Sequence, residues 1–349
     1  MTAEAQLYDE WQQVTWDSCL KLAEALFQLG DLSQALEILE KAAEHAAGFA
    51  PSDPRLTMTL NRLGVLHYYL GHLDKAEAIL GRANAILENL VAQENSERAT
   101  VLFNLAGIAK AQGKYTEAGG LYAQVFNIWV QELGPEHPDV ALCLENMGEI
   151  CLWEHRSLEA LFKLQAALEI KETALGREDW GVAVTLEKLA YLYLSQERYH
   201  EAEPLCRRAA EIKKKVLGQG HPVVARSLHR LAEVYTAVGR SAQAESLYRS
   251  SLSVLEKALG PEHAEVAAGL YALAQSCRAQ GRFGDAEPLF RRVLAIWEKS
   301  PGLSHPDVVR CVESYSKVLR TLHRNAEADK LEARARAARP RQPGAARRT

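Results

Sequence analysis

The chain has 349 residues, of which 48% are hydrophobic and 25% are charged, and its formal net charge is −4. This is the composition of an ordinary soluble protein, and it excludes the strongly basic character of a nucleic-acid-binding chain. The N-terminal residues lack a basic stretch followed by an apolar stretch, so we expect no signal peptide. No apolar run approaches the ~20 residues that a membrane-spanning helix needs.

The cysteines predict a reducing compartment. Six are present, and none forms a CxxC pair. Cys19, Cys151, Cys206 and Cys277 fall on predicted inward faces, where cysteine behaves as a small apolar residue. We therefore expect a cytoplasmic protein without a disulfide framework.

A turn residue followed five positions later by an alanine recurs along the chain. The interval between successive turn residues is 41 once and 42 in the six later cases. The turn residues are Gly30, Gly71, Gly113, His155, Glu197, Gly239, Gly281 and His323, and the alanines are Ala35, Ala76, Ala118, Ala160, Ala202, Ala244, Ala286 and Ala328. Self-similarity at this interval indicates a repeat array in which each unit packs on its neighbours.

The residues before each turn predict a helix, called helix A. Large apolar residues stand eight and eleven positions before the turn, and this spacing marks one face of a helix. A small residue stands seven positions before it, which lets a second helix approach closely. These small residues are Ala23, Gly64, Ala106, Gly148, Ala190, Ala232, Ala274 and Ser316.

The residues after each turn predict a second helix, helix B. Four positions after its alanine stand Leu39, Leu80, Tyr122, Leu164, Cys206, Tyr248 and Phe290, but Glu332 in the last unit. A polar last helix is expected where a repeat array ends in water. In the loop LGPEHP, Gly134 favours a left-handed helix end and Pro138 a helix start. The pattern predicts an all-α protein of about eight helix–turn–helix units.

Two segments resemble the tetratricopeptide repeats of kinesin light chains. They are YHEAEPLCRRAAEIKKKVLGQGHPVVA at Tyr199–Ala225 and LGPEHPDVALCLENMGEI at Leu133–Ile150. The 42-residue unit with an LGxxHPxVA loop is typical of this subclass, whereas the ordinary unit has about 34 residues. The resemblance covers residues 9–335 and implies a right-handed α-solenoid whose helices A line a concave, peptide-binding face. Residues 1–8 would then be an N-terminal extension and residues 336–349 a disordered Arg/Ala/Pro-rich tail.

The chain also departs from that family. Only about eight residues precede the first predicted helix, so the coiled coil of a motor light chain has no counterpart, and we do not expect a motor subunit. The family's LNNLA motif carries paired asparagines. Of these, Asn61, Asn104 and Asn146 remain.

The loop histidines suggest a metal site at first sight. However, His137, His221, His263 and His305 share their place in the repeat with Asp53, Asn95 and Asp179. Aspartate and asparagine are favoured helix N-caps, so we interpret the place as a capping position. Equivalent residues of neighbouring units lie about 10 Å apart, too far to share one zinc ion. The GxG at Leu217–Pro222 follows no strand, and no catalytic motif interrupts the period, so we expect no enzyme, metal or cofactor.

The variable positions ten and nine residues before each turn are the candidate binding site. With the nearby Tyr68, the candidates for a peptide groove are Asn61, Arg62, Tyr68, Phe103, Asn104, Asn146, Lys188, Arg230 and Tyr271. Asparagine can donate to and accept from a peptide backbone, and arginine can form two hydrogen bonds with a carboxylate. The alternative is a solvated face with no fixed partner. Glu145, Glu149, Glu187 and Glu233 predict an acidic middle that repels a uniformly acidic ligand.

The sequence therefore predicts a non-catalytic scaffold that binds an extended segment of a partner protein. No small-molecule substrate or membrane partner is expected. Two alternatives stay open: a self-associating structural scaffold, and a regulatory module of a signalling or enzyme complex. The arginine-rich tail is either a solvated end or a contact for nucleic acid or an acidic protein.

Overall fold

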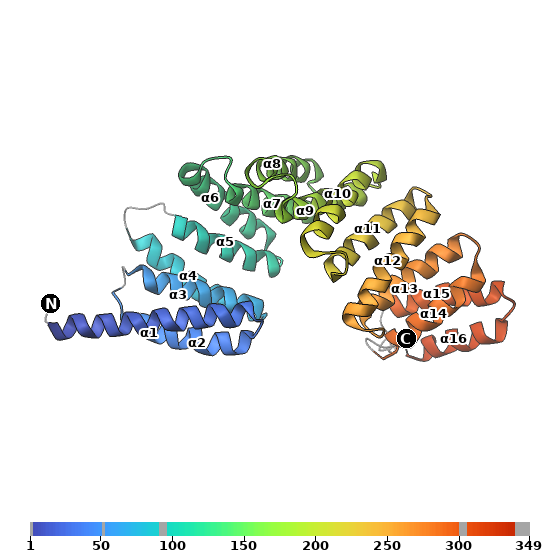
Figure 1. Ribbon diagram of the computed structural model, residues 1–349, viewed down its shortest axis with the longest axis horizontal. Coiled ribbons are helices and arrows are strands. Elements are labelled where there is room, and N and C mark those ends of the chain that lie inside the picture. Colours follow the sequence, from blue (N-terminus) through green and yellow to red (C-terminus); the bar gives the residue numbers. More distant parts are fainter. Residues whose placement is uncertain (1–2, 51–52, 91–95, 300–305, 339–349) are drawn as a thin grey trace, which may run out of the picture. The chain divides into compact units, whose positions relative to one another are not determined.

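The structure is a computed structural model that describes residues 3–50, 53–90, 96–299 and 306–338. Within these ranges it contains sixteen α-helices and no strand, as predicted (Figure 1). The chain divides into two compact units, Met1–Arg177 and Glu178–Thr349. No helix in the described ranges is long and apolar enough to cross a membrane.

Each unit consists of four helical hairpins. The first unit contains α1 (Ala3–Gln28), α2 (Leu32–Ala46), α3 (Pro54–Tyr69), α4 (Leu73–Asn89), α5 (Ser96–Ala111), α6 (Tyr115–Leu133), α7 (Pro138–Trp153) and α8 (Ser157–Leu175). The second unit contains α9 (Trp180–Ser195), α10 (Tyr199–Leu217), α11 (Pro222–Ala237), α12 (Ser241–Leu259), α13 (Ala264–Ala279), α14 (Phe283–Trp297), α15 (Pro306–Thr321) and α16 (Asn325–Ala338). Odd-numbered helices are the predicted helices A, and even-numbered helices are the helices B. Within a unit, each helix packs against the next one along the chain.

The array is predicted to span residues 9–335, and the first and last helices extend a few residues beyond both limits. Helix α1 already begins at Ala3, so most of the predicted extension 1–8 is helical. Helix α16 ends at Ala338, and the rest of the predicted tail lies outside the described residues.

All eight predicted turns close in the same way. The N–H of the turn residue donates to the carbonyl three residues back, and the next N–H donates to the carbonyl five residues back. Gly30 and Asp31, for example, donate over 3.0 Å to Phe27 and Leu26. This is the Schellman ending, which requires a positive φ. Three turns meet it without glycine, at His155, Glu197 and His323, with φ of 60°, 57° and 60°.

The loops between units cap the next helix A as predicted. Asp53, His137, Asp179, His221 and His263 each accept a hydrogen bond from the backbone N–H two residues later. His305 and Asn95 lie outside the described residues. Pro138 occupies the first turn of α7, as expected. The prediction for Gly134 was wrong in detail: its φ of 88° and ψ of 157° place it outside the left-handed helical region, in one that essentially only glycine adopts.

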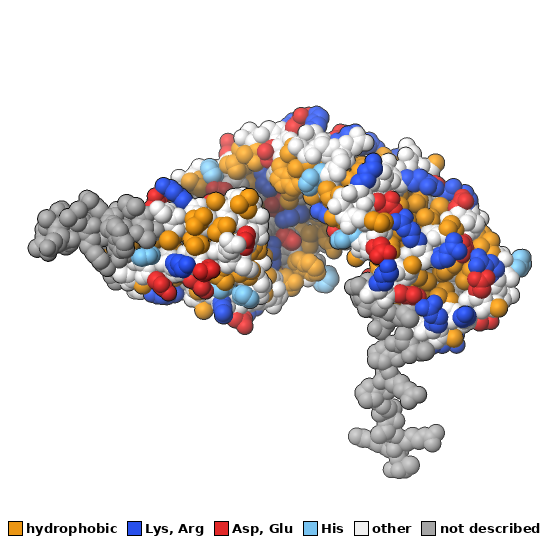
Figure 2. Space-filling view, turned by 60° about the horizontal axis from the view of Figure 1, so that its bottom comes forward, with side chains coloured by type: hydrophobic (Ala, Val, Ile, Leu, Met, Phe, Trp, Pro, Cys, Tyr) orange, Lys and Arg blue, Asp and Glu red, His pale blue; other side chains and the backbone are white. Residues whose placement is uncertain are grey.

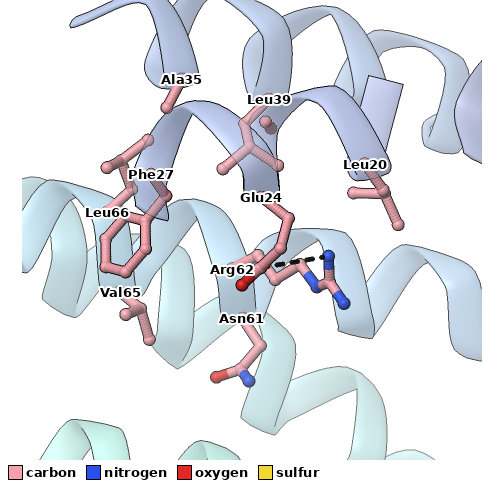
Figure 3. A pocket seen from close by; sticks show the side chains of 10 residues that line it. Leu20, Glu24, Phe27, Ala35, Leu39, Asn61, Arg62, Val65 and Leu66 are labelled. Carbon is pink, nitrogen blue, oxygen red and sulfur yellow. Dashed lines mark ion pairs between the residues drawn. The ribbon is translucent and has the colours of Figure 1, made fainter. Parts of the chain in front are cut away.

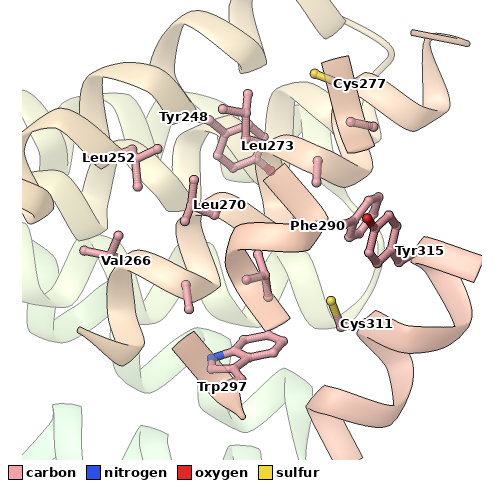
Figure 4. Packing of buried hydrophobic residues seen from close by; sticks show 14 of the residues in the cluster. Tyr248, Leu252, Val266, Leu270, Leu273, Cys277, Phe290, Trp297, Cys311 and Tyr315 are labelled. Atoms are coloured by element: carbon pink, nitrogen blue, oxygen red, sulfur yellow. The ribbon is translucent and has the colours of Figure 1, made fainter. Parts of the chain in front are cut away.

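The predicted packing positions form the core. All eight small residues of helix A are buried, and the repeated alanines of helix B are 0% exposed. A Cβ added to Gly64 would lie 2.5 Å from Leu80 Cγ, so the approach there requires glycine. One predicted core residue, Leu22 in the first hairpin, is 50% exposed. Figure 4 shows the packing in the second unit, where Phe290 of α14 lies beside Tyr315 of α15.

The cysteines are free thiols, as predicted. Five are buried and Cys19 is half-buried. Burial raises the pKa of Cys143 and of Cys311 to about 12, so both thiols stay protonated near neutral pH.

Candidate functional site

Polar contacts join neighbouring helices A within each unit. Asn104 Nδ2 of α5 donates to Asn61 Oδ1 of α3 over 2.8 Å. Lys110 Nζ of α5 donates to Asn146 Oδ1 and Glu149 Oε2 of α7, over 2.8 and 2.9 Å. In the second unit, Ser227 of α11 donates to Glu187 of α9. The helix-A face of the first unit therefore carries a row of polar side chains whose contacts join α3 to α5 and α5 to α7.

Residues ten positions before the turn contact their own helix B. The ring centroids of Phe103 and of Trp129 in α6 are 5.4 Å apart, and those of Tyr271 and of Trp297 in α14 are 5.7 Å apart. In the hairpins between them, Glu145 pairs with Lys171 over 3.1 Å, and Glu187 pairs with Lys213 over 2.5 Å. Because Phe103 and Tyr271 are only half-buried, each still offers part of its ring to a ligand.

These ion pairs change the expected electrostatics of the face. The side chains of Glu145 and Lys171 are 3% and 6% exposed, so this pair is withdrawn from water. Glu187 and Glu149 are likewise paired, with Lys213 and Lys110. The expectation of an acidic middle is therefore wrong for these three glutamates, because each has a lysine beside it. Acidic and basic side chains are also interspersed on the face shown in Figure 2.

The remaining candidates are distributed over both units. Arg62 of α3 lies 3.7 Å from Glu24 of α1, and Asn146 of α7 is buried. Tyr68, near the end of α3, is 37% exposed and lies edge-on to Tyr69. In the second unit, Lys188 of α9 and Arg230 of α11 are half-buried. The structure thus brings Asn61, Arg62, Phe103, Asn104 and Asn146 onto α3, α5 and α7, and Lys188, Arg230 and Tyr271 onto α9, α11 and α13.

An apolar pocket lies between α1 and α3, and Ala35 and Leu39 of α2 also line it (Figure 3). Its volume is about 120 Å³, and Leu20, Phe27, Leu39, Val65 and Leu66 line it. Asn61 and the Glu24–Arg62 pair form its polar edge. A dry cavity of ~150 Å³ accepts a benzene molecule, so this pocket has room for one aliphatic side chain.

Sequence reasoning had missed part of this pocket. Phe27 and Val65 stand three and six residues before their turns, whereas the candidate positions stand ten and nine residues before them. A helix face continues at spacings of three and four, so extending the candidate positions by one helical turn reaches Val65, and by two turns reaches Phe27.

The described residues contain no group of three or more His, Cys, Asp or Glu side chains that could hold a metal ion. The repeats themselves match a known family. The tetratricopeptide repeat model matches residues 16–89, 97–173, 181–257, 228–299 and 265–341. The chain is a tetratricopeptide repeat protein.

The resemblance of this tetratricopeptide repeat protein to kinesin light chains is also confirmed. Protein KINESIN LIGHT CHAIN-RELATED 2 of Arabidopsis thaliana is 27% identical over 155 residues. The match covers 42% of the chain and 21% of that relative, so the chain spans about a fifth of the relative's length.

Solved structures share the fold. BtubC (BKLC) from P. vanneervenii is 23% identical, has a TM-score of 0.59, and is matched over 66% of this chain and 92% of its own. The quorum sensor NprR from B. thuringiensis is 14% identical, has a TM-score of 0.70, and is matched over 95% and 92% of the two chains. At these identities the likeness shows the fold alone.

Proposed function

We propose that this protein is a non-catalytic scaffold that holds an extended segment of a partner protein on its helix-A face. The tetratricopeptide fold is of the protein-interaction type, and curved helical arrays bind partners on such a face. The observation that supports the site is the polar row on α3, α5 and α7 beside the pocket of α1 and α3. We place this activity in the cytoplasm.

The polar row suits the backbone of an extended chain. When Asn104 donates to Asn61, the Asn61 amide N–H groups and the Asn104 side-chain oxygen remain without a hydrogen bond to the described residues. A bound extended chain offers one N–H and one carbonyl per residue, which match these two groups. The neighbouring pocket takes an aliphatic side chain of the same segment, with Arg62 at its edge.

Peptide selection followed by paired variants tests the proposal. Random 12-residue peptides displayed on phage are selected on the full chain, and the affinities of chosen peptides are measured by calorimetry. The change Asn104→Ala with Arg62→Ala should weaken peptides bound at the first unit at least ~10-fold, because it removes direct polar contacts. Arg82→Ala with Asn89→Ala changes the same residue types on the exposed surface of α4 and should have no effect. Equal loss in both double variants, or none in either, would place the binding site elsewhere.

Self-association is a second candidate, and one observation favours it. Leu158 and Phe162 lie one turn apart on α8 and are 74% and 69% exposed. Equivalent positions in the other units carry only small, polar or proline residues. Sedimentation velocity at several concentrations decides: a dimer that is lost on Leu158→Ser with Phe162→Ser supports self-association, and a monomer at every concentration refutes it.

A further inference from the structure

A second cavity lies between α11 and α13 of the second unit and has a volume of about 250 Å³. It opens on the helix-A face, since Arg230 is the residue nine positions before its turn. The cavity exists where the repeat loses side-chain volume. Ala268 and Gly269 of α13 line it, and every other unit carries larger residues at these two positions.

Some of the charged side chains around this cavity have a partner of opposite charge among the described residues, and one does not. Arg226 lies 3.2 Å from Glu265, and His229 lies 3.6 Å from Glu233, a contact that is an ion pair only while the imidazole is protonated. Arg230 also lines the cavity, yet it forms no ion pair or hydrogen bond with a described residue. The Cys206 thiol interacts with Arg230 electrostatically, but burial raises its pKa to about 11, so it supplies no negative charge.

We propose that this cavity is a carboxylate-binding subsite, in which Arg230 binds an aspartate or glutamate side chain of the extended partner segment. This inference rests on the proposed function and adds the chemistry of one ligand position. A half-buried guanidinium can form two hydrogen bonds with a carboxylate, and partial burial strengthens them. The ligand group is a side chain because α9 and α15 continue the unit on both sides, so a bound chain passes over the cavity.

Ala268 and Gly269 provide the room for this group. Ala268 is exposed at the cavity, so a larger side chain there narrows the opening without entering the core. Arg249 is the matched comparison for Arg230: it carries the same charge but lies exposed on α12, outside the cavity, where Glu245 pairs with it.

A double-mutant cycle tests the proposal. Peptides from the displayed library, whose C-termini are fused to the phage protein, are selected on the full chain and synthesised as C-terminal amides. For a peptide with an enriched acidic residue, Glu→Gln or Asp→Asn in the peptide should weaken binding about 10-fold or more. Arg230→Gln in the protein should cause the same loss, and both changes together should cause no further loss. Ala268→Leu should also weaken binding, whereas Arg249→Gln should change it less than about 3-fold.

The outcomes separate this inference from the proposed function. Peptides that bind the wild type but are insensitive to Arg230→Gln overturn the subsite and leave the scaffold function intact. If binding requires a free C-terminal carboxylate, the assignment to a side chain is wrong. A library from which no peptide can be selected contradicts both proposals. Unchanged helicity and Tm of both arginine variants confirm that any loss reflects binding.

Discussion

Hairpins α5/α6 and α7/α8 fill the same place with opposite chemistry. Ten residues before the turn, Phe103 packs on Trp129, whereas Glu145 forms an ion pair with Lys171. The second unit contains the same contrast, with Tyr271 on Trp297 and an ion pair between Glu187 and Lys213. In these four hairpins the two residues 26 positions apart are complementary to each other, although the kind of side chain differs.

The contrast matters because the two solutions respond differently to change. Two aromatic rings gain stability from the apolar surface that they bury. A buried ion pair gains little over an apolar pair, because removing both charges from water costs about as much as their attraction returns. Losing one partner of the ion pair leaves an unpaired charge buried away from water. Single substitutions should therefore destabilise the hairpins with an ion pair and the hairpins with two aromatic rings to different extents.

The largest expected effect is that of Lys171→Ala. Glu145 would lose its buried ion-pair partner, and the free energy of unfolding should fall by ~3–5 kcal/mol. Urea denaturation measures the change. Lys215→Ala, in a pair whose side chains are 61% and 68% exposed, should cost less than ~0.5 kcal/mol and serves as the control. A loss of under ~1 kcal/mol for Lys171→Ala would contradict the account of this place.

Replacing the whole pair sharpens the same test. Glu145→Phe with Lys171→Trp transplants the chemistry of α5/α6 into α7/α8. Because the two new side chains are complementary, the free energy of unfolding of the double variant should lie within ~2 kcal/mol of that of the wild type. It should be well above that of Lys171→Ala. A double variant no more stable than Lys171→Ala would show that these two positions of α7/α8 require an ion pair.

The small residue of helix A is the next comparison. Hairpin α5/α6 accommodates Ala106, but a Cβ added to Gly148 of α7 would lie 2.9 Å from Leu164 Cγ. Gly148→Ala should therefore cost ~1–2 kcal/mol despite the higher helix propensity of alanine. Gly81→Ala in α4, where a Cβ meets nothing within 4 Å, should instead gain ~0.5–1 kcal/mol. Thermal unfolding measures both variants. A lower Tm for Gly148→Ala with a higher Tm for Gly81→Ala would confirm the packing, and shifts of Tm in the same direction would refute it.

Hairpin α3/α4 contains a buried histidine, His67, that should make the stability depend on pH. Burial lowers the pKa of His67, and the nearby His72 and Lys75 act in the same direction against Glu40. The unfolded chain therefore binds this proton more readily, at about pH 6.5. The contribution of His67 is complete above that pH and is lost as the pH falls towards the lowered value.

Leucine occupies the same place in the first and last units, as Leu26 and Leu319. His67→Leu should thus flatten the loss of stability between about pH 7 and 5. The exposed His200→Gln should leave the profile unchanged. Parallel profiles for the wild type and His67→Leu would show that His67 does not cause the acid sensitivity.

The smallest expected effect lies in the turns. Gly113 closes α5/α6 without strain, whereas His155 closes α7/α8 at a φ of 60°. His155→Gly removes a steric cost of ~1–2 kcal/mol but frees the unfolded chain, so the net gain should be ~0.5–1 kcal/mol. Differential scanning calorimetry can resolve this rise in Tm, and a fall would mean that the histidine side chain stabilises the turn.

The sequence was sufficient to predict the structural features that recur in every repeat. Ala35 and its equivalents, the small residues such as Gly148, and the caps such as Asp179 could be predicted because eight copies share one local geometry. The pairing of Glu145 with Lys171 was missed because it joins two helices whose relative register the period alone does not state. Comparing residues 26 positions apart in every unit would have revealed it.

The candidate site was less predictable for a related reason. Asn61, Arg62 and Asn104 were located by helical spacing. Whether a charge is already paired, however, depends on side-chain rotamers, which distinguish Arg226 from Arg230 only in the folded chain. The size of a cavity likewise depends on what two neighbouring helices lack, as Ala268 and Gly269 show.

Photo-crosslinking tests the central claim most directly. A selected peptide carrying a benzophenone side chain at successive positions is irradiated with the full chain, and the crosslinked residues are identified by mass spectrometry. We expect crosslinks on the helices A of one unit, either α3, α5 and α7 or α9, α11 and α13. Crosslinks concentrated on α4 and α6, or on α10 and α12, would show that the helix-A face is not where this protein holds its partner.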